Sequence, residues 1–413
     1  YVINTTTGEA RAIGTGAFTP ALAGDVAAFD FNPTVDRIRL ISTGGQNLRL
    51  NPETGTVAFT DGSLNIGGTA NANISSAAYT ENKAGATTTV LFDIDVNNDI
   101  LYKQDPPNAG GLMAVGNLGI DLSGTGEFDI AAAENIGLAV YNSGSTPSVF
   151  TIDLSTGKAT NVGMLGGATS VRGIAIPTLP VAYAVQNGNT LLILNPDAPV
   201  SVSKSITGTA TGETIVDIDF RPVNGQLYAL GSQSNLYSIN TSNGAAAKVG
   251  TQFSTLLTGT DFGFDFNPTV DRIRVVSNLG LNLRVHPVTG LVAFVDGSLT
   301  EGASVGGAAY TNNFAGATTT VLFDIDPVAD KLYKQDPPNN GTLVAIGDLG
   351  LNATAVGGFD IAGTSGNAWA VLTVDGKTRL HKINLSNGSA SPSPANFEFT
   401  GGAITAFAIG LGF

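Results

Sequence analysis

The chain has 413 residues, of which 42% are hydrophobic and only 13% charged, and its 53 glycines and 18 prolines disfavour a helical protein. The net charge is −14 and the 19 Lys and Arg residues are scattered singly, which argues against nucleic acid as a partner. There is no run of 18 apolar residues, so we expect no membrane span, and the absence of cysteine fits an exported protein.

The predicted strands follow an internal duplication. FDFNPTVDRIRLIS, which begins at Phe29, returns as FDFNPTVDRIRVVS at Phe264, a shift of about 235 residues. The strings AGATTTVLFDID and LYKQDPPN also occur once in each half. The chain is therefore predicted to consist of two homologous halves.

In chain order, each repeated unit opens with a short apolar strand that often carries one aspartate. These strands are predicted at 26–31, 76–80, 127–131, 172–176, 215–220, 262–266, 307–311, 358–362 and 403–409. Turns such as IDLSTG and INTSNG end the third strand of a unit, because Asn or Asp supplies a side-chain acceptor and Gly a positive φ. Four strands per unit predict an all-β fold, a β-propeller.

We expect two homologous five-bladed propeller units, because a ten-bladed ring exceeds the usual size of propellers. The first unit is predicted at 1–180 and the second at 181–413, closed by pairing of the C-terminal strand with the strand that begins at 182. The alternative is one continuous nine- to ten-bladed ring, which the hairpin-like spacing between GIAI and VAYAV favours.

The first unit is expected to be incomplete at its N-terminus and to lack its leading blade, because Tyr1 aligns with Tyr237 and the segment equivalent to 182–236 has no counterpart. The unpaired edge of such a blade is a template for strand addition, which predicts self-assembly at the N-terminal blade. The alternative expectation is an upstream segment, with a signal peptide that is absent from this chain.

The FNPTVDRIR string, followed by NLR and by ATTTVLFDID, resembles a bacterial family of exported propeller proteins of unknown function, present here as a tandem duplication. The resemblance covers nearly the whole chain twice. It implies a propeller fold and a secreted or cell-surface location. It implies no reaction, so no catalytic residue is carried over.

Six arginines form the concentrated positive charge of the chain and are candidate ligand-binding residues. They are Arg37, Arg39, Arg49, Arg272, Arg274 and Arg284. Together with Asp36 and Asp271 they favour a structural ladder of ion pairs between blades, and the alternative is the binding of an anionic sugar or carboxylated ligand.

The opening strands carry an aspartate at a recurring position. Asp30, Asp129, Asp219, Asp265 and Asp360 recur at the same place in their units. The favoured interpretation is structural, with each carboxylate accepting hydrogen bonds from backbone N–H groups of a neighbouring blade. In the alternative, Asp219, Asp265 and Asp360 converge on a cation, because hard cations prefer several oxygen ligands.

A second acidic segment alternates like a calcium loop, with Asp93, Asp95, Asn97 and Asp99. It has no Gly at its sixth position and no Glu at its twelfth, so a plain hairpin turn is favoured and calcium is the weaker alternative. No other cofactor is predicted.

The sequence contains no Gly-x-Ser-x-Gly elbow and no identifiable catalytic base. The favoured hypothesis is a noncatalytic extracellular or cell-surface propeller that acts as a structural, adhesive or self-assembling scaffold, with other protein subunits or surface glycans as partners. The alternatives are a carbohydrate- or cation-binding lectin-like module and a hydrolase that uses channel carboxylates.

Overall fold

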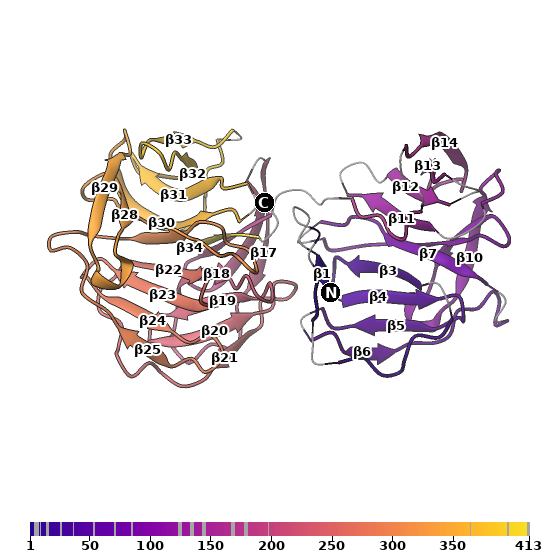
Figure 1. Ribbon diagram of the computed structural model, residues 1–413, viewed down its shortest axis with the longest axis horizontal. Coiled ribbons are helices and arrows are strands. Elements are labelled where there is room, and N and C mark those ends of the chain that lie inside the picture. Colours follow the sequence, from indigo (N-terminus) through magenta and orange to yellow (C-terminus); the bar gives the residue numbers. More distant parts are fainter. Residues whose placement is uncertain are drawn as a thin grey trace. The chain divides into compact units, whose positions relative to one another are not determined.

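In a computed structural model, the chain divides into two compact units, residues 1–179 and 180–413. In the described ranges both units consist of strands and turns without an α-helix (Figure 1), so the predicted all-β class is confirmed. The structure describes the whole chain except residues 4–7, 9, 14–15, 25–26, 36, 53, 70–71, 84–85, 123–125, 133–135, 143–145, 167–169, 177–180, 197, 364, 395 and 411–413.

The described part of the first unit contains three four-stranded antiparallel sheets and a two-stranded one. Its strands are β1 (Val2–Ile3), β2 (Ala10–Arg11), β3 (Ala27–Asn32), β4 (Arg37–Ser42), β5 (Asn47–Leu50), β6 (Val57–Thr60), β7 (Ile74–Tyr79), β8 (Leu91–Asp95), β9 (Ile100–Gln104), β10 (Leu112–Asn117), β11 (Gly126–Ala131), β12 (Ile136–Tyr141), β13 (Ser148–Ile152) and β14 (Ala159–Met164). A short 3₁₀ helix, η1 (Pro107–Ala109), connects β9 to β10.

The described part of the second unit contains five four-stranded antiparallel sheets. Its strands are β15 (Ala182–Gln186), β16 (Thr190–Asn195), β17 (Ala198–Ser205), β18 (Ile215–Phe220), β19 (Leu227–Gly231), β20 (Asn235–Ile239), β21 (Ala246–Val249), β22 (Phe262–Asn267), β23 (Arg272–Ser277), β24 (Asn282–Val285), β25 (Val292–Val295), β26 (Gly307–Tyr310), β27 (Leu322–Asp326), β28 (Lys331–Gln335), β29 (Leu343–Asp348), β30 (Ala353–Ile361), β31 (Ala368–Val374), β32 (Lys377–Ile383), β33 (Ala390–Pro392) and β34 (Ile404–Ile409). The 3₁₀ helix η2 (Pro338–Asn340) repeats η1.

The C-terminal strand joins the sheet that opens the second unit. β34 pairs with β15 in antiparallel register, with Ala182 opposite Ile409 and Gln186 opposite Ile404. The predicted pairing between the last strand and the strand that begins at 182 is therefore confirmed.

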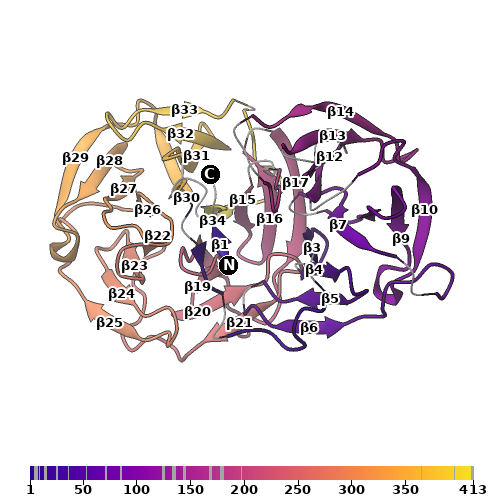
Figure 2. The ribbon, with the colours of Figure 1, turned by 45° about the vertical axis from the view of Figure 1, so that its right-hand side comes forward.

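The first strands of successive sheets lie side by side within each unit. In the second unit β18 contacts β22, β22 contacts β26, β26 contacts β30, β30 contacts β34, and β34 contacts β18. Figure 2 shows β22, β26 and β30 on the inside of the unit, whereas the fourth strands β25, β29 and β33 lie at its outside. In the first unit β3 contacts β7 and β7 contacts β11.

Turn residues end the third strand of a sheet as the sequence predicts. Asp153 Oδ1 accepts hydrogen bonds from the backbone N–H of Ser155 at 2.8 Å and of Thr156 at 3.2 Å. Gly157 then adopts a φ of +80°, which a residue without a Cβ adopts at little cost. In the equivalent turn INTSNG, Gly244 has a φ of +77°.

The strand predicted at 172–176 is not formed. These residues are described, but they have no strand assignment, and β15, which the single-ring alternative would pair with them, pairs with β34 instead. A backbone segment without a pairing partner does not form a strand, whatever its apolar content.

The hydrophobic core lies between neighbouring sheets. One buried cluster joins Leu230 of β19 to Phe264 of β22 and Val275 of β23, and another joins Phe323 of β27 to Phe359 of β30. Because side chains of most strands pack on both faces of their sheet, the strands are apolar with little alternation.

Candidate functional site

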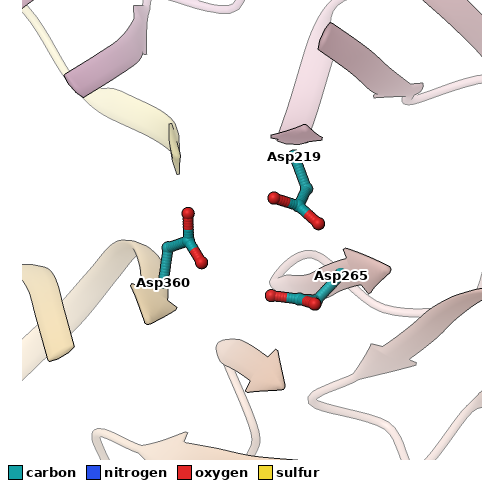
Figure 3. Close-up of side chains that lie close together, drawn as sticks. All are labelled: Asp219, Asp265 and Asp360. Atoms are coloured by element: carbon teal, nitrogen blue, oxygen red, sulfur yellow. The ribbon is translucent and has the colours of Figure 1, made fainter. Parts of the chain in front are cut away.

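Three carboxylates from different sheets of the second unit converge in its interior. Asp219 lies on β18, Asp265 on β22 and Asp360 on β30, and one oxygen from each lies within 4.8 Å of the others. All three are buried. Figure 3 shows the Asp265 carboxylate directed toward those of Asp219 and Asp360.

Carboxylates of this group also hold neighbouring strands together. Asp219 Oδ2 accepts a hydrogen bond from the backbone N–H of Phe266 on β22 at 2.8 Å, and Asp360 Oδ2 accepts one from Ile409 on β34 at 2.6 Å. These bonds give acceptors to backbone groups at the edge of each sheet. These two hydrogen bonds agree with the structural interpretation of the aspartates.

The first unit repeats this arrangement with two aspartates. Asp30 Oδ2 accepts a hydrogen bond from the backbone N–H of Tyr79 on β7, and Asp129 Oδ2 accepts one from Ile176, both at 2.6 Å. The segment 172–176 thus keeps the predicted contact although it forms no strand. Burial raises the pKa of Asp30 to about 7, and Asp129 contributes to that rise.

The surroundings of the carboxylate group in the second unit disfavour its ionised form. Burial raises the pKa of Asp219 and of Asp265 well above the usual range and that of Asp360 to about 7. A fourth buried carboxyl, Asp217, adds to the negative charge that acts on Asp219 and Asp265. The backbone N–H of Tyr310 donates to Asp265, but the Oδ1 of Asp265 is buried without a partner.

The segment proposed as a calcium loop forms a hairpin turn. Asp95 Oδ1 accepts hydrogen bonds from the backbone N–H groups of Asn97 at 2.9 Å and Asn98 at 3.2 Å. Asp99 Oδ1 accepts one from Leu122 at 2.9 Å. The carboxylates of this segment thus hydrogen-bond to the backbone, as in the favoured interpretation, and in the described residues they do not join a group of three carboxylates.

Asp93 does not take part in that turn and lies in the interior. Both of its oxygens are buried without a hydrogen-bond partner, and the same holds for its counterpart Asp324 on β27. Burial raises the pKa of Asp93 well above the usual range and that of Asp324 to about 8, although Arg39 and Arg274, respectively, oppose the rise.

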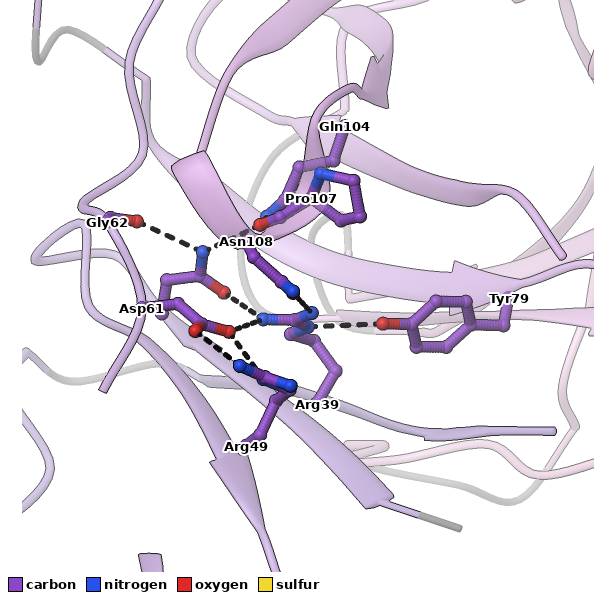
Figure 4. Close-up of polar contacts among 9 residues, drawn as sticks. Arg39, Arg49, Asp61, Gly62, Tyr79, Gln104, Pro107 and Asn108 are labelled. Carbon is purple, nitrogen blue, oxygen red and sulfur yellow. Dashed lines mark hydrogen bonds and ion pairs between the residues drawn. The ribbon is translucent and has the colours of Figure 1, made fainter. Parts of the chain in front are cut away.

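Arg39 is the centre of a buried polar network (Figure 4). Its Nε donates to the Tyr79 hydroxyl at 3.1 Å, and its Nη2 donates to the side-chain oxygen of Asn108 at 2.9 Å. Its Nη1 donates to Asn47 Oδ1 at 2.8 Å and to Asp61 Oδ2 at 2.7 Å. Because Tyr79 is on β7 and Asn108 in η1, this network joins the β3–β6 sheet to the next sheet.

Arg49 completes the network from the neighbouring strand. Its Nε and Nη2 donate to the two oxygens of Asp61 at 2.7 and 2.8 Å, and its guanidinium lies 4.1 Å from the centre of the Phe59 ring. Burial raises the pKa of Asp61, but hydrogen bonds from Arg49 and Arg39 outweigh it and hold that pKa below the usual value.

The second unit repeats the network with the same residue types. Its members are Arg274, Arg284, Asp296, Asn282, Tyr310, Asn339 and Phe294. Each of these residues lies in a sequence string that occurs in both halves. The sequence analysis did not predict Asp296, Asn282, Tyr310 and Asn339 as partners of the arginines, and this repetition is the signal that could have indicated them.

The other two of the six candidate arginines, Arg37 and Arg272, lie at the start of their strands. Arg272 Nη1 donates to the backbone oxygen of Asp271 at 2.8 Å, and Arg37 begins β4 at the equivalent position. Asp271 forms two hydrogen bonds with Arg221 at 2.8 and 2.5 Å, while Asp36 lies outside the described residues. Arg39 and Arg274 are each 2% exposed, so their guanidinium groups serve the interior, and ligand binding by the six arginines stays a prediction.

Comparison with known families assigns the chain to a family of unknown function. A family model described as Domain of unknown function (DUF4394) matches residues 1–175 and 190–408. The chain belongs to this family and carries its domain in two segments. A search of curated proteins found no match. Among the described residues, no helix is long and apolar enough to cross a membrane.

Proposed function

We propose that each unit is a β-propeller, with five blades in the second unit. The contacts that run from β18 through β22, β26, β30 and β34 back to β18 support a closed ring in this unit. Pairing of β34 with β15 supports closure by strands from both ends of the unit, a common device in propellers.

On this fold we propose a noncatalytic scaffold that binds other protein surfaces, including further copies of the chain. The observation that carries the proposal is a set of exposed apolar side chains on the β24–β25 hairpin, which we call the apolar hairpin surface: Val288, Leu291, Phe294 and Val295. All four side chains are more than half exposed. Exposed apolar side chains that are concentrated in one short segment are typical of interaction sites.

The first half supports this assignment by contrast. At the positions of Val288, Leu291 and Val295 it carries Glu53, Thr56 and Thr60. The same hairpin therefore tolerates polar residues, and the fold does not require the apolar ones. Binding of another protein surface by the second unit would explain why Val288, Leu291 and Val295 are apolar.

The proposed setting is extracellular or at the bacterial cell surface, with protein subunits or surface glycans as partners. The absence of cysteine and the resemblance to exported propeller proteins support it. A net charge of −14 keeps such a protein soluble while the apolar hairpin surface makes specific contacts.

The test exchanges residues between the two halves. The triple variant Val288→Glu, Leu291→Thr and Val295→Thr introduces the residues of the first half, and the control variant Ala245→Glu with Ala247→Thr changes the exposed β20–β21 hairpin. Sedimentation velocity should show concentration-dependent association of the wild type and the control that the triple variant loses. Association that is equal in all three proteins, or absent from the wild type, would contradict the proposal.

A further inference from the structure

We propose that Asp219, Asp265 and Asp360 bind one divalent cation, for which calcium is the best match. This site is separate from the apolar hairpin surface and does not depend on the scaffold function. Each ligand comes from the first strand of a different sheet, β18, β22 and β30, so a bound ion would connect three sheets of the second unit.

The spacing of the oxygens fits a shared ion. Calcium takes oxygen ligands at about 2.3–2.6 Å, which places ligands on opposite sides of the ion about 5 Å apart. The three carboxylates each offer one oxygen within 4.8 Å of the others. No side chain has to move far for the group to surround an ion.

The Oδ1 of Asp265 provides an independent indication of a ligand. It is buried without a hydrogen-bond partner, on a residue that is 1% exposed. Figure 3 shows this carboxylate turned toward the other two. A buried carboxylate oxygen without a partner costs free energy, and a cation between the three groups would remove that cost.

The surrounding charge also requires compensation. The charged groups that act on Asp219 and Asp265 are other carboxyls: Asp217 and Asp360 act on both, and Asp219 also acts on Asp265. Their hydrogen-bond donors are backbone N–H groups, which carry no net charge. Several buried carboxyls without a basic partner are neutralised by a cation or by bound protons, and these two outcomes can be separated by experiment.

Calcium fits this donor set better than magnesium. The three carboxylates offer one oxygen each, and calcium accepts six to eight oxygens, including those of water, in irregular geometry. Magnesium demands octahedral geometry and keeps most of its water, which a buried site formed by three strands accommodates poorly. The described residues of the first unit, in which Asp30 is equivalent to Asp265, form no such group of three.

The experiment is calorimetric titration of the chelator-treated full chain with CaCl₂ and separately with MgCl₂. The test variant is Asp265→Asn, which keeps the side-chain shape and an acceptor for the backbone N–H of Tyr310. The control is Asp30→Asn in the first unit. We expect one calcium per chain, with a dissociation constant on the order of 10⁻⁵ to 10⁻³ M, in the wild type and the control. Asp265→Asn should abolish this binding.

Thermal unfolding of the same proteins separates the cation from bound protons. If calcium binds, it raises the melting temperature of the wild type and the control but not that of Asp265→Asn. The proposal is overturned if calcium gives neither heat nor a shift while Asp265→Asn melts higher than the wild type, because the carboxyls are then held by protons. Equal affinity for magnesium would overturn the assignment to calcium.

Discussion

At the residue scale, the clearest feature is the buried arginine of each unit, which donates hydrogen bonds to several side chains, only one of which is a carboxylate. Arg39 and Arg274 were predicted as members of a structural ladder, and each forms hydrogen bonds to a neighbouring sheet. The predicted ladder named Asp36 and Asp271 as its acids, whereas the carboxylates in the networks are Asp61 and Asp296. These follow the arginines by 22 residues, and only the closed hairpins bring them together.

Removal of the Arg274 guanidinium should strongly destabilise the second unit. Arg274→Met leaves the side-chain oxygens of Asn282 and Asn339 without their arginine donor, and Asp296 keeps only its bonds to Arg284. Loss of one partner of a buried ion pair costs about 3–5 kcal/mol. Chemical denaturation followed by intrinsic fluorescence measures the loss. Arg272→Met, which removes a hydrogen bond at a partly exposed site, should cost about 1 kcal/mol or less. Equal losses in both variants would refute a special role for Arg274.

Asp324 should make stability fall as the pH rises. Burial raises its pKa to about 8, from an ordinary value of 3.8. Between these values the folded protein retains a proton that the unfolded chain has released, so the free energy of unfolding decreases with increasing pH. Asp324→Asn removes this penalty and should stabilise the protein by a few kcal/mol at pH 9 and not at pH 4, as measured by denaturation at both pH values.

Asp296 gives the opposite trend and is the control. Hydrogen bonds from Arg284 and Arg274 outweigh burial and lower its pKa. Its contribution is therefore present above the ordinary pKa and is lost as the pH falls through the lowered value. Asp296→Asn should destabilise the protein at neutral pH and lose that effect in acid. A pH profile with the same sign for both variants would exclude this account.

At the element scale, most opening strands could be predicted because the repeat fixes their positions twice. The predictions at 215–220 and 262–266 agree with β18 and β22 within a residue. The prediction at 172–176 was wrong, since strand formation depends on a partner that apolar content does not reveal. The register shift between Val356 and Phe359 lies at Gly357 and Gly358, so the paired glycines were its signal in the sequence.

Glycines at the outer strands allow the turn of one sheet to approach the next. A Cβ on Gly347 of β29 would lie 1.9 Å from the backbone oxygen of Asn387, in the turn before β33. Gly347→Ala should therefore lower the free energy of unfolding by about 1–3 kcal/mol, because backbone must move. Gly166→Ala is the control, since a Cβ there meets no atom within 4 Å. Thermal denaturation should show a clear shift for the first variant only.

At the scale of the whole molecule, duplication of the sequence predicted two halves and the comparison with families found its domain in two segments. The convergence of Asp219, Asp265 and Asp360 was one of the two interpretations that the sequence predicted. It could be predicted because equivalent positions on the first strands of the sheets face the same interior. The unpartnered oxygen of Asp265 could not be predicted, since it depends on local packing. The exposure of Val288 and Leu291 likewise follows from the position of the hairpin at the edge of a sheet.

The two units should unfold as separate cooperative bodies, because each has its own core and its own strand pairing. Phe407 on β34 is buried in the core of the second unit, and Phe128 on β11 is buried in that of the first. Phe407→Ala should lower the stability of the second unit by about 3–5 kcal/mol, and Phe128→Ala should do the same to the first. In differential scanning calorimetry each variant should shift one transition and leave the other in place. A single transition that both variants shift equally would show that the chain unfolds as one body, and would favour a continuous ring over two.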